Sequence, residues 1–216
     1  RSSGSRPPMR TEPFPSAGNE DSITRQSFIS SMALEALKAS VDGSRIVQRG
    51  DYEYMVHPLT DGIPRVDPVL LREVVDAMAE VGDFDCDTIV TIEALGIPLA
   101  TALSLKTGKP FNVVRKKMYG LPGEVNLTQV TGYSKSALFI NGIQPGERVT
   151  IVDDVISTGG TLWALVEALK KMQVRIVDII VVVEKTDKKA EIERKIGCPI
   201  KTLVKVEVID GKARVV

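Results

Sequence analysis

One continuous stretch, with the order strand, turn and helix, constrains the fold of this chain more than any other. Residues 149–152 favour β-structure and lead directly into two acids, Asp153 and Asp154. A turn rich in hydroxyl groups and glycine follows at 157–161, and residues 162–170 place apolar side chains at helical spacing. We therefore expect a strand, a tight turn and a helix in immediate succession.

The turn at 157–161 has the composition of an anion site. Main-chain N–H groups at the start of a helix point outward, and the helix dipole adds positive potential there. Two glycines let the backbone approach a ligand, while Asp153 and Asp154 can accept from sugar hydroxyls or from a metal's water shell. The alternative is an ordinary junction with Ser or Thr as helix cap. Two adjacent acids favour the ligand site, because like charges repel unless a cation or a polyol uses them.

The composition is that of one globular domain in a reducing compartment. The 216 residues are 43% hydrophobic, and 28 basic side chains balance 28 acidic ones, so any anion site must be local rather than global. Cys86 and Cys198 lack a metal-binding spacing and are expected to be structural thiols. With no long apolar run and no apolar signal region, we expect a cytoplasmic protein with no membrane or nucleic-acid partner.

The first part of the chain differs in composition from the rest. Residues 1–30 are rich in Ser, Pro, Arg and Gly and are expected to form a disordered tail, whereas 31–216 should form one domain. Apolar spacing at 28–41 predicts a short helix, and alternation at 49–56 predicts a strand. The packed globule is expected to start near Ile46.

The remaining segments alternate between strand and helix patterns. The expected elements are helices at 68–78, 97–105 and 191–196, strands at 88–92, 109–114, 138–142, 176–183 and 201–209, and a closing strand or hairpin around the turn at 210–211. This order predicts an α/β fold with a central parallel sheet flanked by helices. The weakly apolar, glycine-containing segment 118–136 is expected to form a mobile lid.

Two further segments follow predicted strands and so belong at the ligand-binding edge of the sheet. The loop 93–96 follows the strand at 88–92, and the basic triplet 115–117 follows the strand at 109–114. Cations at this edge favour pyrophosphate contact over a merely solvated surface, although Lys116 and Lys117 cannot be ranked. His57, the single histidine, precedes a proline in a turn, which favours a loop-positioning role over a catalytic one.

The stretch 149–161 closely resembles the ribose-5-phosphate-binding signature of type I phosphoribosyltransferases. The resemblance extends over residues 46–208. At 49–62, 90–98 and 181–185 the sequence most resembles archaeal hypoxanthine (guanine) phosphoribosyltransferases and bacterial xanthine phosphoribosyltransferases. It implies the type I fold with a small hood, phosphoribosyl pyrophosphate as cosubstrate, and a homodimer. It also implies Mg²⁺ as cofactor, bound through the pyrophosphate with Asp153 or Asp154 nearby.

The resemblance assigns roles to individual residues. Asp153 and Asp154, expected to be exposed at the strand end, would hold the ribose hydroxyls and, with Lys116 and Lys117, act in catalysis. Lys185 and Val155 would contact the base. The residues that would bind phosphoribosyl pyrophosphate are Glu93, Ala94, Leu95, Gly96, Arg115, Lys116, Asp153, Asp154, Ser157, Thr158, Gly159, Gly160 and Thr161.

The implied reaction is purine salvage, in which phosphoribosyl is transferred to a 6-oxopurine, because a lysine at position 185 can only donate to O6. The alternatives are an adenine enzyme and a phosphoribosyl-pyrophosphate-sensing regulator. Leu95 and Gly132 depart from the arginine and glutamate of adenine enzymes, and residues 1–45 do not resemble the helix-turn-helix of the regulators. Ser157 stands where some hypoxanthine-guanine enzymes have an aspartate, so the general base is unassigned.

Overall fold

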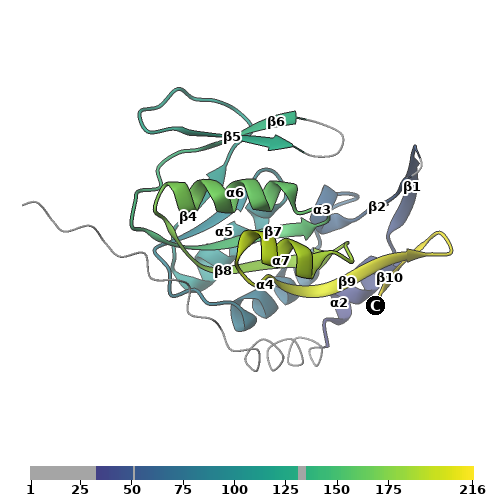
Figure 1. Ribbon diagram of the computed structural model, residues 1–216. Helices are drawn as coiled ribbons and strands as arrows, with labels where there is room; N and C mark the ends of the chain where they lie inside the picture. The colour runs from purple at the N-terminus through teal and green to yellow at the C-terminus, as the bar shows by residue number, and fades with distance from the viewer. Residues whose placement is uncertain (1–32, 51, 131–134) are drawn as a thin grey trace, which may run out of the picture. The chain divides into compact units, whose positions relative to one another are not determined.

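A computed structural model describes residues 33–50, 52–130 and 135–216 (Figure 1). Within these residues the strands form one six-stranded sheet and two small two-stranded sheets. The elements are α2 (Glu35–Asp42), β1 (Arg45–Arg49), β2 (Tyr52–Val56), α3 (Pro58–Asp61), α4 (Pro68–Val81), β3 (Thr88–Ile92), α5 (Gly96–Thr107), β4 (Phe111–Val114), β5 (Val125–Val130), β6 (Lys135–Ile140), β7 (Arg148–Ile156), α6 (Gly160–Lys171), β8 (Arg175–Glu184), α7 (Lys189–Ile196), β9 (Lys201–Ile209) and β10 (Lys212–Val215).

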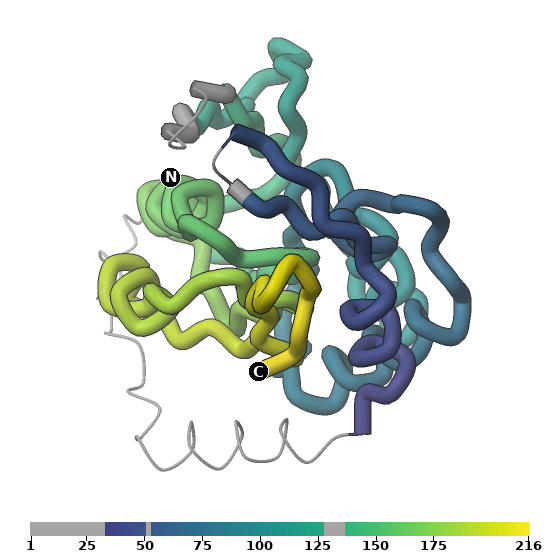
Figure 2. The backbone as a smooth tube through the Cα atoms, turned by 90° about the vertical axis from the view of Figure 1, so that its right-hand side faces the viewer, coloured from purple at the N-terminus to yellow at the C-terminus, as the bar shows by residue number. Residues whose placement is uncertain are grey.

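The large sheet has the order β10-β9-β8-β7-β3-β4 and is parallel except for β10, which forms a hairpin with β9. Its central strands β7 and β8 are buried along most of their length, which matches their nearly continuous apolar sequences. Figure 2 shows α6 and α7 on one side of this sheet and α4 and α5 on the other. The predicted α/β class with a central, mainly parallel sheet flanked by helices is confirmed.

Helix α4 shows how local sequence signals fix an element. Asp67 lies at its N-cap, where Oδ1 accepts a hydrogen bond of 2.8 Å from the Val69 N–H, and Pro68 occupies the first helical position. The buried side chains of α4 share one face, as the apolar spacing predicts. None of the helices in the described ranges is long and apolar enough to cross a membrane.

The packed domain begins earlier in the sequence than expected. Leu37 and Val41 of α2 are fully buried, so the core includes residues well before Ile46. The Glu73 carboxylate of α4 accepts hydrogen bonds from the Ala36 and Leu37 N–H groups, at 3.1 and 2.8 Å. This cap comes from a distant helix and leaves no local signal. The predicted tail at 1–30 and the first part of the predicted helix lie outside the described residues.

Part of the segment expected to be a lid belongs to a two-stranded hairpin. Strand β5 pairs with β6 in antiparallel register, from Val125 opposite Ile140 to Leu127 opposite Leu138 and beyond. Leu127 is only 6% exposed and belongs to the hydrophobic core. The prediction that this segment contributes nothing to the core is therefore wrong, because Leu127 among polar residues gives too weak an alternation to reveal a strand. The mobility of the segment stays a prediction. Residues 131–134 lie outside the described residues.

Candidate active site

The two acids lie in the carboxyl-terminal part of β7, between β3 and β8. Asp153 is paired with Val181 of β8, and β7 continues past Asp154 to Ile156. Asp154 is only 8% exposed, and Asp153 is half-buried. The expectation of exposed carboxylates is therefore wrong, because β3, β8 and α5 pack around this part of the strand.

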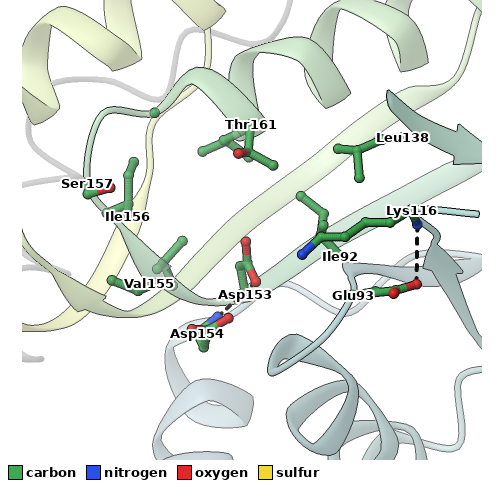
Figure 3. A pocket seen from close by; sticks show the side chains of 13 residues that line it. Ile92, Glu93, Lys116, Leu138, Asp153, Asp154, Val155, Ile156, Ser157 and Thr161 are labelled. Atoms are coloured by element: carbon green, nitrogen blue, oxygen red, sulfur yellow. Dashed lines mark hydrogen bonds between the residues drawn. The ribbon is translucent and has the colours of Figure 1, made fainter. Parts of the chain in front are cut away.

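A cavity of about 330 Å³ opens at this edge of the sheet (Figure 3). The residues lining it are Ile92, Glu93, Lys116, Leu138, Asp153, Asp154, Val155, Ile156, Ser157, Gly159, Thr161, Leu162 and Val181. The predicted site residues outside this lining are Ala94, Leu95, Gly96, Arg115, Lys117, Thr158, Gly160 and Lys185. The structure thus brings both acids, part of the turn and one cation around the same space.

Burial changes the protonation of the acid pair. Removal from water raises the pKa of the Asp153 and Asp154 carboxyls, and the negative charge of Asp153 raises the pKa of Asp154 further. The Asp154 N–H donates to Asp153 Oδ1 at 3.0 Å, which partly stabilises one anion. Without a ligand, the pair therefore tends to share a proton, and a cation or a set of hydroxyl donors would relieve the repulsion.

The turn before α6 requires glycine at position 159. Gly159 has a φ of 70°, in the left-handed region, and a Cβ there would lie 2.8 Å from side-chain atoms of Ile192 in α7. Helix α6 starts at Gly160, so the first N–H groups of a three-turn helix face this edge of the sheet. Ser157 and Thr161 line the cavity beside the turn. The arrangement suits a phosphate.

The basic triplet does not act as one patch. Arg115 Nε donates to Glu93 Oε2 at 2.6 Å, so this guanidinium is paired with a carboxylate. The main-chain N–H of Lys116 donates to the same oxygen at 3.2 Å, and the Lys116 side chain points toward Asp153 in Figure 3. The Lys117 ammonium instead lies 5.6 Å from the centroid of the Tyr119 ring. Lys116 is therefore the cation of the triplet that faces the cavity.

The loop between β3 and α5 approaches the acid pair closely. The Glu93–Ala94 peptide bond is cis. A Cβ on Gly96, the first residue of α5, would lie 2.0 Å from Thr91 Oγ1 and 3.0 Å from Asp153 Oδ1. Only glycine fits there without displacement. The buried Thr91 hydroxyl has no hydrogen-bond partner among the described residues.

The two predicted base contacts lie on different hollows. Val155 lines the first cavity, whereas Lys185 lines a second cavity of about 390 Å³ together with Glu53, Met55, Thr186, Asp187, Lys205, Val206, Glu207 and Val208. The Lys185 N–H nevertheless donates to the Ile156 carbonyl at 2.8 Å, so Lys185 follows β8 directly beside the end of β7. The two residues are held close to one another by the sheet.

His57 is an interior residue that caps α3. Its Nδ1 accepts from the Leu59 N–H at 3.2 Å, and its Nε2 lies 2.8 Å from Ser40 Oγ. Burial, together with the positive charge of Lys185, lowers the pKa of His57 to about 4. The neutral ring lines neither cavity, which agrees with a positioning role.

Sequence reasoning missed the polar pair Tyr54 and Asp61, which face Lys185 from β2 and α3. The Tyr54 hydroxyl donates to Asp61 Oδ1 at 2.6 Å, and the Lys185 ammonium lies 5.2 Å from the centroid of the Tyr54 ring. The only available signal was that Tyr54 precedes the turn-prone segment 57–62 and that Asp61 lies within it. Both residues are far from Lys185 in the sequence, so no local pattern predicts their contact with it.

The residues at the β7 edge fit a magnesium ion that is brought by a phosphate ligand. Among the described residues, no group of three or more His, Cys, Asp or Glu side chains could hold a metal alone. Mg²⁺ is commonly bound by one or two carboxylates together with substrate phosphates and water. Asp153 and Asp154 supply such carboxylates, and because burial raises the pKa of both, a cation beside them would favour their ionised form.

These features define an α/β protein that binds a phosphorylated, hydroxyl-rich ligand at the carboxyl edge of its sheet. The strand order changes direction there, because β8 and β9 follow β7 on one side and β3 and β4 lie on the other. Residues 71–210 match the family described as the phosphoribosyl transferase domain. The chain belongs to this family.

Relatives and solved structures agree with this assignment. A hypoxanthine/guanine phosphoribosyltransferase of Methanothermus fervidus is 51% identical over 184 residues, covering 85% of this chain and 97% of that protein. One from Methanohalophilus mahii is 54% identical over 175 residues, covering 81% and 92%. The adenine phosphoribosyltransferase structure from Thermoanaerobacter pseudethanolicus superposes with a TM-score of 0.64 at 23% identity, covering 80% and 99%, and shows the shared fold.

Proposed function

We propose that this protein transfers the 5-phosphoribosyl group from phosphoribosyl pyrophosphate to a ring nitrogen of a 6-oxopurine, hypoxanthine or guanine. The products are a nucleoside monophosphate and pyrophosphate. The observation that carries the proposal is the meeting of the acid pair and the phosphate turn at one cavity on the β7 edge. Relatives about half identical to this chain, named hypoxanthine/guanine phosphoribosyltransferases, support the same reaction.

The site offers a place for each part of the cosubstrate. The turn at 157–161 and the start of α6 hold the 5′-phosphate, and Asp153 and Asp154 accept hydrogen bonds from the ribose hydroxyls. The loop after β3 and the Lys116 ammonium face the pyrophosphate. Mg²⁺ bound with the pyrophosphate, near Asp153 or Asp154, supplies further positive charge to this group.

Catalysis by this arrangement is mainly electrostatic. As the bond at C1 breaks, positive charge develops on the sugar and negative charge on the leaving pyrophosphate. The preorganised Lys116 ammonium stabilises the second, and the nearby Asp153 and Asp154 oxygens favour the first. Leu138 of the β5–β6 hairpin lines the cavity from above in Figure 3 and helps to exclude water.

The base lies between Val155 and Lys185 in this proposal. An ammonium group has only donors, so it pairs with the O6 acceptor of a 6-oxopurine and opposes the amino group of adenine. The adenine alternative is supported by solved structures that are at most 25% identical and therefore indicate the fold rather than the base. Relatives with about twice that identity carry the 6-oxopurine names.

We also propose that residues 31–216 form the catalytic domain, and that the enzyme serves purine salvage as a cytoplasmic homodimer. The dimer rests on the family resemblance, and sedimentation of a monomer at micromolar concentration would refute it. The regulator alternative predicts specific binding to DNA, which a filter-binding assay at two salt concentrations would reveal. Production of nucleoside monophosphate by the purified chain excludes a regulator that lacks catalysis.

The decisive test is a comparison of bases. We expect wild-type kcat/KM to be higher for hypoxanthine or guanine than for adenine, and Lys185→Ala to lose much of that discrimination. Lys188→Ala, an exposed lysine in the same charged segment, is the matched control and should retain it. A wild-type preference for adenine, or full discrimination in Lys185→Ala, contradicts the assignment of the base.

A further inference from the structure

Lys185 is held by the segment that comprises β2 and α3 (residues 52–61), which we call the hood. Its ammonium lies 5.2 Å from the centroid of the Tyr54 ring and 3.5 Å from the Met55 carbonyl oxygen, both in β2. Burial lowers the pKa of Lys185, so the ammonium form needs a compensating negative charge. A lysine in such surroundings is positioned by its neighbours.

Asp61 provides a fixed negative charge beside this ammonium. Its carboxylate accepts from the Tyr54 hydroxyl at 2.6 Å, from the His57 N–H at 2.9 Å and from Thr60 Oγ1 at 2.7 Å. Burial alone would raise the pKa of Asp61, but these three donors and the charge of Lys185 outweigh it and hold the pKa below its ordinary value. Asp61 therefore remains an anion at neutral pH.

Other charged groups also lie around Lys185. Asp154 attracts the ammonium, as Asp61 does. His57 is neutral at its lowered pKa. The Arg49 guanidinium packs on the Tyr54 ring at 4.4 Å from its centroid and adds a positive charge to the cluster. Glu53, Asp187 and Glu207 line the same cavity as Lys185, and Asp187 and Glu207 are paired with Lys205. Asp61 is the acid that is joined to Lys185 through the Tyr54 ring.

The charge on Lys185 decides which purine it can accept. An ammonium has no lone pair and cannot accept a hydrogen bond, whereas a neutral amine can accept one from the amino group of adenine. A Lys185 that lost its proton, or that moved away from the base, would therefore stop rejecting adenine. The residues that position the Lys185 ammonium therefore also determine the selectivity between the two kinds of purine.

We propose that Tyr54 and Asp61 are positioning residues for base selection. Through the Tyr54 hydroxyl, Asp61 fixes the ring against which the Lys185 ammonium lies, and its negative charge attracts that ammonium. The hood, rather than the sheet edge, therefore sets the choice between a 6-oxo and a 6-amino purine. This inference rests on the proposed contact of Lys185 with the base.

Two variants of the full-length chain test the inference kinetically. Asp61→Asn removes the charge, and Tyr54→Phe removes only the hydroxyl that donates to Asp61 and keeps the ring. We expect each to lower the ratio of kcat/KM for hypoxanthine to that for adenine by about tenfold, with KM for phosphoribosyl pyrophosphate unchanged. Asp76→Asn, which breaks an exposed ion pair with Lys106, is the control and should leave the ratio unchanged.

A double-variant cycle shows whether both residues act through Lys185. In a Lys185→Ala background, Asp61→Asn and Tyr54→Phe should produce no further loss of discrimination. An unchanged ratio in the single variants, an equal loss in the Lys185→Ala background, or an equal rise of KM for phosphoribosyl pyrophosphate would each overturn the inference. Because Tyr54→Phe removes a single oxygen, it supplies a folded variant even if Asp61→Asn is unstable.

A measurement without substrate separates this inference from the proposed function. Reductive methylation with ¹³C-formaldehyde gives each lysine an NMR signal, and the signal missing from Lys185→Arg belongs to Lys185. We expect its titration midpoint to fall in Asp61→Asn, because a negative charge has been removed. An unchanged midpoint overturns the positioning role. If the wild type prefers adenine while the midpoint falls, the proposed function fails and the control of Lys185 by Asp61 stands.

Discussion

The β7 edge and the hood place polar side chains around the same ligand-binding region, but they do so in different ways. At the β7 edge, the acid pair, the turn and α6 follow one another in sequence, so a strand and a helix start position them locally. In the hood, Tyr54 and Asp61 reach Lys185 across most of the chain. The residues of the β7 edge are therefore positioned mainly by local sequence, whereas the surroundings of Lys185 depend on long-range packing.

We expect the largest effect when the charges of the acid pair are removed. Asp153→Asn combined with Asp154→Asn should lower kcat/KM by more than about a hundredfold, because the oxygens that face the ribose lose their charge. We expect the variant to fold. Asp76→Asn is the matched control for loss of a carboxylate away from the site. Wild-type turnover by the double variant would refute the site.

The same double variant also tests how the free energy of unfolding depends on pH. Burial raises the pKa of both carboxyls above the ordinary value of 3.8, so the folded state holds a proton that the unfolded state releases. The acid pair should therefore make the free energy of unfolding fall as pH rises above about 4, whereas His57, with its lowered pKa, acts in the opposite direction in both the wild type and the variant. Urea unfolding at pH 5 and pH 8 should therefore show a more favourable change with rising pH in the double variant than in the wild type. An equal change with pH in both proteins would mean that burial does not raise the pKa of these two carboxyls.

A smaller effect is expected where the loop of β3 approaches the acids. Gly96→Ala would place a Cβ 2.0 Å from Thr91 Oγ1, and the shift needed should cost about 1 to 3 kcal/mol of stability. Activity should fall too, since Asp153 lies beside the same position. Adding Thr91→Ala should restore part of the loss. Gly43→Ala, whose Cβ would lie 3.4 Å from the Ala39 carbonyl oxygen, is the control and should cost little stability.

The smallest effect concerns the start of the domain, far from both regions. Glu73→Ala removes the carboxylate that caps α2 and should lower the free energy of unfolding by about 1 kcal/mol, with kcat/KM nearly unchanged. Glu80→Ala, at an exposed position of the same helix, should have almost no effect. Equal stabilities of the two variants in urea would show that α2 contributes little to the fold.

The sequence allowed the sheet edge to be predicted because its signals are local. Apolar runs identify β7 and β8, and Asp67 with Pro68 marks the start of α4. The burial of Asp154 was not predictable in this way, because it depends on neighbouring strands that are distant in sequence. The pairing of Arg115 with Glu93 likewise needs two strand ends to meet.

The hood and the hairpin show the opposite limit. The cap on α2 is the Glu73 carboxylate of α4, which is distant in sequence, and β5 is recognisable as a strand only from its pairing with β6. A single buried Leu127 is too weak a pattern to predict this hairpin from the sequence. The contact between the hood and Lys185 depends in turn on where β2, α3 and the end of β8 come together in three dimensions.

The contact between Gly159 and Ile192 gives α7 an influence beyond its own surface. Helix α7 supplies no atom to the cavity, yet its isoleucine forms the floor on which the phosphate turn rests. In a library of random substitutions selected for growth on an external purine, larger side chains at position 192 would therefore be lost together with those at position 159. Helix α7 therefore constrains the turn although it contributes nothing to the lining of the cavity.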